Sequence, residues 1–228
     1  ISSIAPYAFY SNYYMSSVTI SDNVTSIYEY AFYSCINMKA LNIPKGVTLI
    51  GKSAFDNCKG LTSIDIPEGI SIINESVFAS IYGITSIIIP ESVEIIGVNA
   101  FQYCHNVNSI TMPKNVKEIC SGAFSGTSIT NFSIPEQITI ISESLFASCS
   151  NLSLIALHTN IEEIQWSAFS YCESLTNFTI PKKVTKISSK LFYHCSKLSS
   201  VTLHDNINII GEQSFQNTNI SSIEIPNG

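Results

Sequence analysis

Apolar residues recur along the chain with a period of 23 residues. Ten of the twelve phenylalanines fall in one column of this repeat, and the interval shortens to 22 only between Phe124 and Phe146. A fixed period of this length is typical of a solenoid, in which each repeat is one turn that buries its apolar side chains against its neighbours. The column consists of Phe9, Phe32, Phe55, Phe78, Phe101, Phe124, Phe146, Phe169, Phe192 and Phe215.

Each repeat also contains a short segment with the pattern of a β-strand. Two apolar residues alternate with polar ones, as at Ile64 and Ile66, which is the period of a strand with one buried face. Proline usually follows, as at Pro67, and ends the strand because it has no N–H to donate to a sheet. A second apolar pair three residues apart, such as Ile70 and Ile73, completes the turn.

These columns predict a leucine-rich-repeat-type solenoid. We expect stacked short parallel β-strands on the concave face, and short strands, turns, 3-10 or helical turns on the convex side. Residues 1–228 form a single array of about ten turns of 22–23 residues, which we interpret as a fragment of a longer protein because it begins partway through a repeat. The strand comes one residue early near Thr127 and Thr218, and we expect shortened convex turns there that leave the strands in register.

Charge and composition exclude several classes of function. Only 12% of residues are charged, the net charge is −6, and all eleven basic residues are lysine. Nucleic-acid binding needs a basic face and favours arginine, so no nucleic-acid partner is expected. No apolar run approaches the roughly 20 residues that span a bilayer, so no membrane insertion is expected within this chain.

Seven cysteines and four histidines are the candidates for chemistry. Six cysteines follow the repeat phenylalanine by three residues, in a column that also accepts Ile81 and Thr127, so they are interpreted as buried packing thiols. Stacked disulfides, metal ligation and intermolecular pairing are less favoured alternatives. Cys120 lies in another column and is expected to be the most reactive thiol. No catalytic or cofactor motif occurs and the histidines do not converge, so we expect no enzyme, no cofactor and no metal.

The repeat resembles the BspA-like leucine-rich repeat family. The resemblance rests on a pattern that includes Ile43-Pro44, Val47, Ile50-Gly51, Ala54-Phe55 and Cys58, and that recurs over essentially the whole chain. It implies a surface or secreted protein of a bacterium or protist that adheres to host or matrix proteins. The family has no shared catalytic residues to carry over.

The outward positions of the predicted strands are the expected protein-binding surface, because solenoids commonly bind ligands on the concave face. Half of the predicted binding residues bear a hydroxyl group, and only Ile88, Leu154 and Ala156 of this set are apolar. Trp166, Tyr28 and Tyr30 lie on another strip and offer an alternative contact. The predicted binding residues are Ser63, Asp65, Ser86, Ile88, Ser109, Thr111, Asn131, Ser133, Leu154, Ala156, Asn177 and Thr179.

Two further groups of residues are candidates for modification or contact. Clustered lysines suggest a basic patch for an acidic partner or a glycosaminoglycan, although a solvated basic turn is the simpler interpretation. Six sequons would accept N-linked glycans in a secreted protein. The basic patch comprises Lys182, Lys183, Lys186 and Lys190, and the sequons begin at Asn23, Asn74, Asn131, Asn151, Asn177 and Asn219.

The favoured hypothesis is therefore a non-enzymatic, cell-surface or secreted adhesion module that binds a protein ligand. The alternative is a cytoplasmic interaction scaffold of the same fold, which would suit free cysteines. A spacer without a ligand of its own is the third interpretation.

Overall fold

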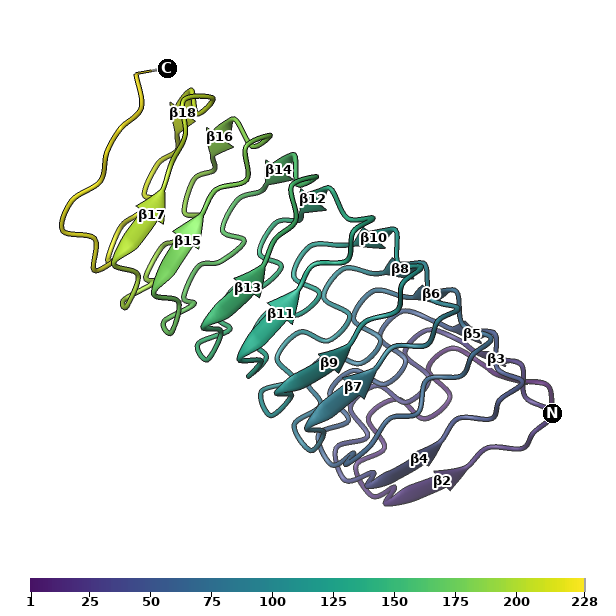
Figure 1. The fold of residues 1–228 in the computed structure, drawn as a ribbon. Coiled ribbons are helices and arrows are strands. Elements are labelled where there is room, and N and C mark those ends of the chain that lie inside the picture. Colours follow the sequence, from purple (N-terminus) through teal and green to yellow (C-terminus); the bar gives the residue numbers. More distant parts are fainter. Residues whose placement is uncertain (228) are drawn as a thin grey trace.

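The computed structural model describes residues 1–227, and these form a parallel β-solenoid with no helix (Figure 1). The solenoid predicted from the repeat is confirmed. Most turns contribute a long strand, a tight turn that usually begins at a proline, a short strand and a second set of turns around the repeat phenylalanine. The helical alternative for this last segment does not occur in the described residues, because tight left-handed turns take its place.

The strands form two rows along the array. The long strands are β2 (Ser17–Thr19), β4 (Ala40–Asn42), β7 (Ser86–Ile88), β9 (Ser109–Thr111), β11 (Asn131–Ser133), β13 (Leu154–Ala156), β15 (Asn177–Thr179) and β17 (Ser200–Thr202). The short strands are β1 (Ser3–Ile4), β3 (Ser26–Ile27), β5 (Leu49–Ile50), β6 (Ile72–Ile73), β8 (Ile95–Ile96), β10 (Glu118–Ile119), β12 (Ile140–Ile141), β14 (Glu163–Ile164), β16 (Lys186–Ile187) and β18 (Ile209–Ile210).

The repeat phenylalanines form one stacked column through the core. Neighbouring rings such as Phe55 and Phe78 lie nearly parallel, with centroids 5.8 Å apart and planes 5° apart. The ring spacing is 5.0 Å for Phe9 and Phe32 and 6.2 Å for Phe124 and Phe146. Offset aromatic pairs add about 0.5–1.5 kcal/mol each to the apolar burial that holds neighbouring turns together.

A third hydrogen-bonded row, here called the turn ladder, runs along the phenylalanine column. The residues two before and two after each phenylalanine often adopt positive φ, as Asn99 (55°) and Tyr103 (58°) do around Phe101. This geometry points the phenylalanine N–H at the next turn, so that Phe101 donates to the carbonyl of Ala123 at 2.9 Å. The turn ladder continues along the whole column and joins every turn to the next.

The two strand rows, in contrast, are interrupted at three places, here called joints, where the strands of neighbouring turns do not pair. Figure 1 shows the long strands gathered in pairs, and the short strands fall into matching groups. The stacked parallel strands therefore do not form one continuous sheet along either row. The joints separate four blocks, which contain β1 to β5, β6 to β10, β11 to β14, and β15 to β18.

Two expectations about the strands need correction. Residues 63–65 follow the strand pattern but form no strand in the structure, and they lie at the first joint. The shortened turn at Thr127 leaves β11 in register with β13, which follows it, but β11 does not pair with β9 before it. The missing residue therefore coincides with the second joint.

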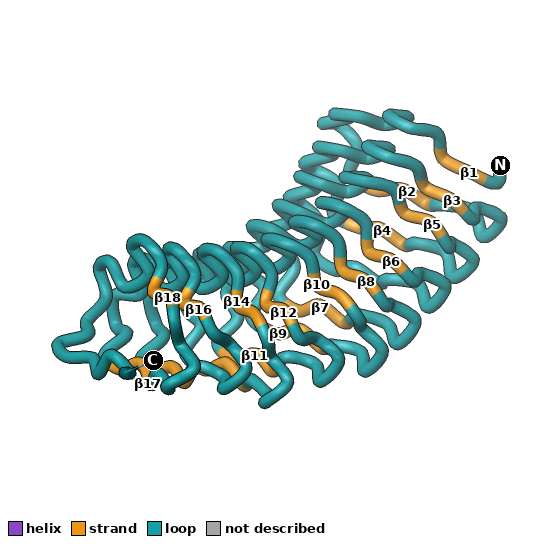
Figure 2. The backbone as a smooth tube through the Cα atoms, turned by 90° about the horizontal axis from the view of Figure 1, so that it is seen from above, coloured by secondary structure: helices purple, strands orange, loops and turns teal. Residues whose placement is uncertain are grey.

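The array is curved, and the turn segments line the inner edge of the bend in the view of Figure 2. We therefore name the surfaces by their strands and not by the curvature. The long-strand face carries the outward residues of β2 to β17, and the short-strand face carries those of β1 to β18.

Candidate binding surface

All twelve predicted binding residues are exposed on the long-strand face. Each long strand places its first and third side chains outward and its middle side chain in the core. Ser63 and Asp65 are exposed as well, although their segment is not a strand. The surface is mostly polar, and it contains two large apolar side chains: Ile88 is 68% exposed and Leu154 is 64% exposed.

Phenylalanines in the inward position of two long strands mark two of the joints. Phe132 of β11 packs between Phe124 and Phe146, with centroid distances of 5.5 and 5.0 Å. Phe178 of β15 makes the same kind of contact with Phe169 and Phe192. Both strands pair with the strand that follows and not with the strand before. We infer that the bulky ring holds each strand away from the preceding turn.

The short-strand row shows how each joint is bridged. Within blocks, the residue after the short strand donates its backbone N–H to the preceding turn, as Gly97 does to the Ile73 carbonyl at 2.7 Å. At the three joints a polar side chain makes this bond instead. The donors there are Asn74 Nδ2 to the Ile50 carbonyl, Ser142 Oγ to the Ile119 carbonyl and Ser188 Oγ to the Ile164 carbonyl.

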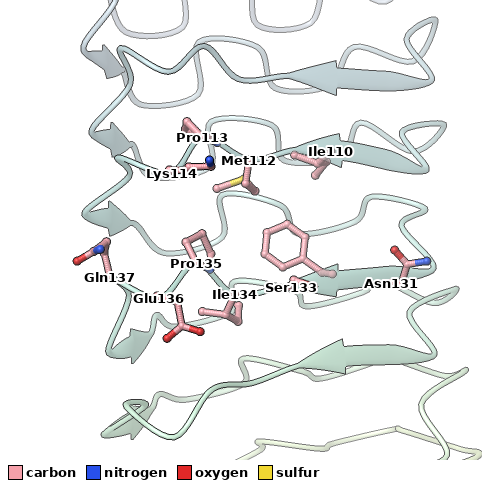
Figure 3. Close-up of a pocket in the computed structure, with 11 residues that line it drawn as sticks. Ile110, Met112, Pro113, Lys114, Asn131, Ser133, Ile134, Pro135, Glu136 and Gln137 are labelled. Carbon is pink, nitrogen blue, oxygen red and sulfur yellow. The ribbon is translucent and has the colours of Figure 1, made fainter.

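A groove of about 540 Å³ opens at the second joint, between β9 and β11 (Figure 3). Ile110 and Met112 form one apolar wall, and Phe132 and Ile134 form the other. Ile110 and Met112 are only half-buried, whereas Ile87 and Ile89, their counterparts one turn earlier, are 4% and 3% exposed. The groove therefore exposes core positions that are covered where the strands pair.

This groove continues around the side of the solenoid. Beyond Lys114 and Gln137 it meets a hollow that also borders Lys117, and a third hollow of about 480 Å³ lies between β10 and β12. Gln137 borders all three hollows. The strand pattern predicted Asn131 and Ser133 at the groove but not Met112, which is accessible because the strands separate there. It also did not predict Lys114 and Gln137, which are exposed in the proline turns outside the predicted strands.

The turn ladder carries aromatic clusters that the strand pattern did not predict. Tyr30 stacks on Tyr7 at 5.0 Å and Tyr33 stacks on Tyr10 at 4.9 Å, which forms a four-ring group near the N-terminal end. Of the alternative strip, Tyr30 is half-buried in this group, whereas Tyr28 and Trp166 are exposed and lie six repeats apart along the chain. Trp166 instead has the Lys190 ammonium 5.6 Å from its ring centroid, near Tyr193.

The four lysines of the predicted basic patch differ in their surroundings. Lys182 and Lys186 are exposed, but Lys183 pairs with Glu162 at 3.1 Å and Lys190 is half-buried against Trp166. The surface they present is thus partly neutralised, and an acidic ligand stays a prediction.

Five of the six sequon asparagines are exposed. Asn74 is half-buried, and its amide donates to the Ile50 carbonyl at 2.6 Å, so a glycan on this nitrogen would disrupt the first joint. Asn131 and Asn177 lie on the long-strand face beside the joints, where glycans would cover the predicted binding surface. The other exposed asparagines are Asn23, Asn151 and Asn219.

The cysteine column consists of buried free thiols. Each thiol donates to the carbonyl of a phenylalanine in the preceding turn, as Cys104 does to Phe78 at 3.2 Å. Burial raises the pKa of Cys104 to about 12, which makes the thiolate scarce. Cys120 is more accessible, but burial and the neighbouring Glu118 carboxylate raise its pKa to about 11.

The histidines act as local hydrogen-bonding groups. His158 and His204 replace the strand-ending proline, and each Nε2 lies 3.0 Å from the proline carbonyl of the preceding turn. No group of histidine, cysteine and acidic side chains within residues 1–227 has the spacing to hold a metal ion. In the same residues, no helix is long and apolar enough to cross a membrane.

The stacked turns, the two strand rows and the exposed polar strand face define a solenoid repeat protein of the scaffold class. A family model described as a BspA type leucine-rich repeat region (6 copies) matches residues 2–128, 72–197 and 117–228. The chain therefore belongs to the BspA-type leucine-rich repeat family, as the sequence resemblance predicted.

Several solved structures have a similar fold. A leucine-rich repeat protein of T. pallidum is 27% identical over 71% of this chain and 78% of its own, with a TM-score of 0.65. A leucine-rich repeat protein of Eubacterium ventriosum is 19% identical over 98% and 82%, with a TM-score of 0.60. The pneumococcal vaccine antigen PcpA is 18% identical over 97% and 74%, with a TM-score of 0.59. Among curated proteins, none matches the sequence.

Proposed function

We propose that this protein is a non-enzymatic adhesion module of the cell surface or of the secreted fraction, and that it binds protein ligands through the long-strand face. The observation that carries the proposal is the row of exposed side chains on this face, which the repeat does not require for folding. Solenoids use such extended surfaces for binding because each turn adds contact area without changing the fold.

The composition of the surface supports weak contacts repeated along the array. Hydroxyl side chains occupy half of the predicted positions, and the large aromatic and arginine anchors of tight interfaces are missing from them. Ile88 and Leu154 are the two large apolar side chains among them, so they are the best candidates for anchors. The surface location is supported by membership of the BspA-type family and by the description of one structural neighbour as a pneumococcal vaccine antigen.

Charge substitution of the two apolar side chains tests the binding face. The double variant Ile88→Glu, Leu154→Glu is expected to weaken binding to an immobilised panel of extracellular-matrix proteins by about tenfold or more, because each carboxylate must be desolvated on contact. Surface plasmon resonance measures the affinities, and circular dichroism reports the fold.

The matched control carries the same substitution on the short-strand face. Leu49 and Ile72 are 38% and 43% exposed, and the double variant Leu49→Glu, Ile72→Glu should bind the matrix panel as the parent protein does. Equal binding by the parent protein and both variants would show that the long-strand face is not the contact surface.

The location needs a separate experiment. Native material that is secreted and glycosylated should lose mass on enzymatic deglycosylation, with Asn131 and Asn177 the most informative sites because their glycans would cover the binding face. A full open reading frame without a signal peptide or an anchor would favour the cytoplasmic scaffold instead.

A further inference from the structure

We propose that the groove at the second joint binds an extended polypeptide segment, whose main chain pairs with the open edges of β9 and β11. This inference deepens the proposed function, on which it rests, by naming the kind of ligand and the place where it binds. The ligand is a segment that alternates apolar with polar residues and carries an acidic residue near one end.

The two strands beside the groove each have an open edge. Within residues 1–227, β9 pairs with β7 alone and β11 pairs with β13 alone, so each has one edge without a strand partner. These two edges face each other across the groove (Figure 3). Unpaired strand edges present N–H and C=O groups in the spacing that an added strand requires.

The groove also exposes apolar side chains that belong to the core. A strand placed in the groove points every other side chain inward. Those side chains would meet Ile110 and Met112, which are half-buried, and the small accessible edge of Phe132, which is 5% exposed. Burial of this apolar surface would favour a ligand with aliphatic residues at alternate positions, as in the long strands of the protein itself.

Shape and charge fix the remaining features of the ligand. The hollows that share Gln137 continue past the proline turn, so a segment longer than one strand can follow the path of a turn around the solenoid. Lys114 is exposed on one wall of the groove, and its ammonium makes no ion pair in the described part of the chain. Glu136 stands on the opposite wall, 3.8 Å from His158. An acidic ligand residue would therefore pair with Lys114.

Replacing the buried Phe132 with a smaller side chain tests the proposal, because it should close the groove. Leu41 occupies the position of Phe132 in β4, and β4 pairs with the strand before it. The variant Phe132→Leu should therefore let β11 approach β9 and leave no room for a ligand. The probe is a phage-displayed library of linear nine-residue peptides, selected on the parent protein alone.

Enriched peptides should alternate apolar and polar residues and bind the parent protein at least about tenfold more tightly than Phe132→Leu by fluorescence anisotropy. The matched control Phe178→Leu changes the third joint and should leave binding unchanged. N-methylation of alternate peptide nitrogens should also weaken binding by about tenfold, because it removes main-chain donors.

A second pair of variants does not depend on core repacking. Ser133→Arg places a long side chain at the rim of the groove and should reduce peptide binding, while Thr202→Arg occupies the equivalent exposed position of β17 and should not. Failure to enrich peptides, equal binding to Phe132→Leu or Ser133→Arg, or insensitivity to N-methylation would each overturn the proposal. If matrix binding still depends on Ile88 and Leu154 in that case, the proposed function stands without the groove.

Discussion

Cysteine is suited to its column because it serves two purposes in a buried position. Its side chain packs as a small apolar group, and its thiol supplies a weak second donor to a phenylalanine carbonyl of the preceding turn. The Phe32 carbonyl, for example, accepts the Cys35 backbone N–H in its own turn and the Cys58 thiol from the next turn. Thr127 fills the same column and donates to the carbonyl of Phe124 in its own turn. The six cysteines and Thr127 thus combine a small volume with a donor, whereas Ile81 occupies the column by packing alone.

The burial of these thiols predicts a sharp difference in reactivity. Cys120 is expected to react first with an uncharged maleimide in the native protein, because it is the one cysteine of the seven that is not buried. Its raised pKa makes this reaction slow near pH 7 and faster as the pH rises toward 11, where the thiolate becomes abundant.

Mass spectrometry of the labelled protein measures the order of reaction. The six thiols of the column, for example Cys104 and Cys172, should react only after unfolding in guanidinium chloride. The variant Cys120→Ser is the control and should show no label under native conditions. Rapid native labelling of the column cysteines would contradict the packing interpretation.

At the scale of the element, the joints show how neighbouring turns are connected where their strands do not pair. Strand pairing within a block depends on backbone N–H groups, and at a joint one serine or asparagine side chain makes the equivalent bond. A short polar side chain extends the reach of the donor, so it can bridge turns whose backbones are too far apart to pair. We infer that these three side chains hold the blocks together where the strand rows are interrupted.

Removal of one bridging hydroxyl should weaken the third joint. Ser188 is buried, and its Oγ donates to the Ile164 carbonyl at 2.6 Å. Ser188→Ala should lower the free energy of unfolding by about 1 kcal/mol, because the carbonyl loses its partner in a site that water reaches poorly. Urea denaturation followed by circular dichroism measures the change.

Ser196→Ala is the matched control, since Ser196 is exposed in the following turn. Its effect should stay within about 0.5 kcal/mol, as for most surface substitutions. Equal losses of stability in the two variants would show that the bridging bond has no special role.

At the scale of the whole molecule, the four blocks are held together by the rows of contacts that continue across the joints. The phenylalanine column and the turn ladder continue through all four blocks, while both strand rows stop at each joint. Because each turn of a solenoid contacts only its neighbours, stability is a sum of interfaces. The joints are then the interfaces with the fewest backbone hydrogen bonds.

Hydrogen exchange should reveal this division. Residues 63–65 lie outside both strand rows, so their amides should exchange much faster than those of residues 86–88 in β7. The Phe55 and Phe78 amides flank the same joint but donate to the carbonyls of Val77 and Ala100, and they should be protected. Nuclear magnetic resonance or peptide-level mass spectrometry measures the rates. Equal protection of residues 63–65 and 86–88 would show that the first joint is closed in solution.

The periodic columns determined the fold, the buried phenylalanines and cysteines, and the exposed strand positions. They could do so because the residue types in each column indicate which side of a turn faces the core, and the same assignment holds in every stacked turn. The packing of cysteine against phenylalanine and the exposure of Ile88 and Leu154 follow from this rule. The family resemblance follows from the same columns.

The joints, the groove and the aromatic clusters were decided only by the tertiary structure. Phe132 and Leu41 are both apolar and satisfy the same column, so the pattern does not distinguish them, and only the packing of a larger ring shows that β11 is displaced. Met112 and Gln137 border a groove because two strand pairs separate there, and Tyr7 meets Tyr30 because neighbouring turns stack. Such features depend on volumes and on contacts 23 residues apart, which a local pattern of polar and apolar residues does not contain.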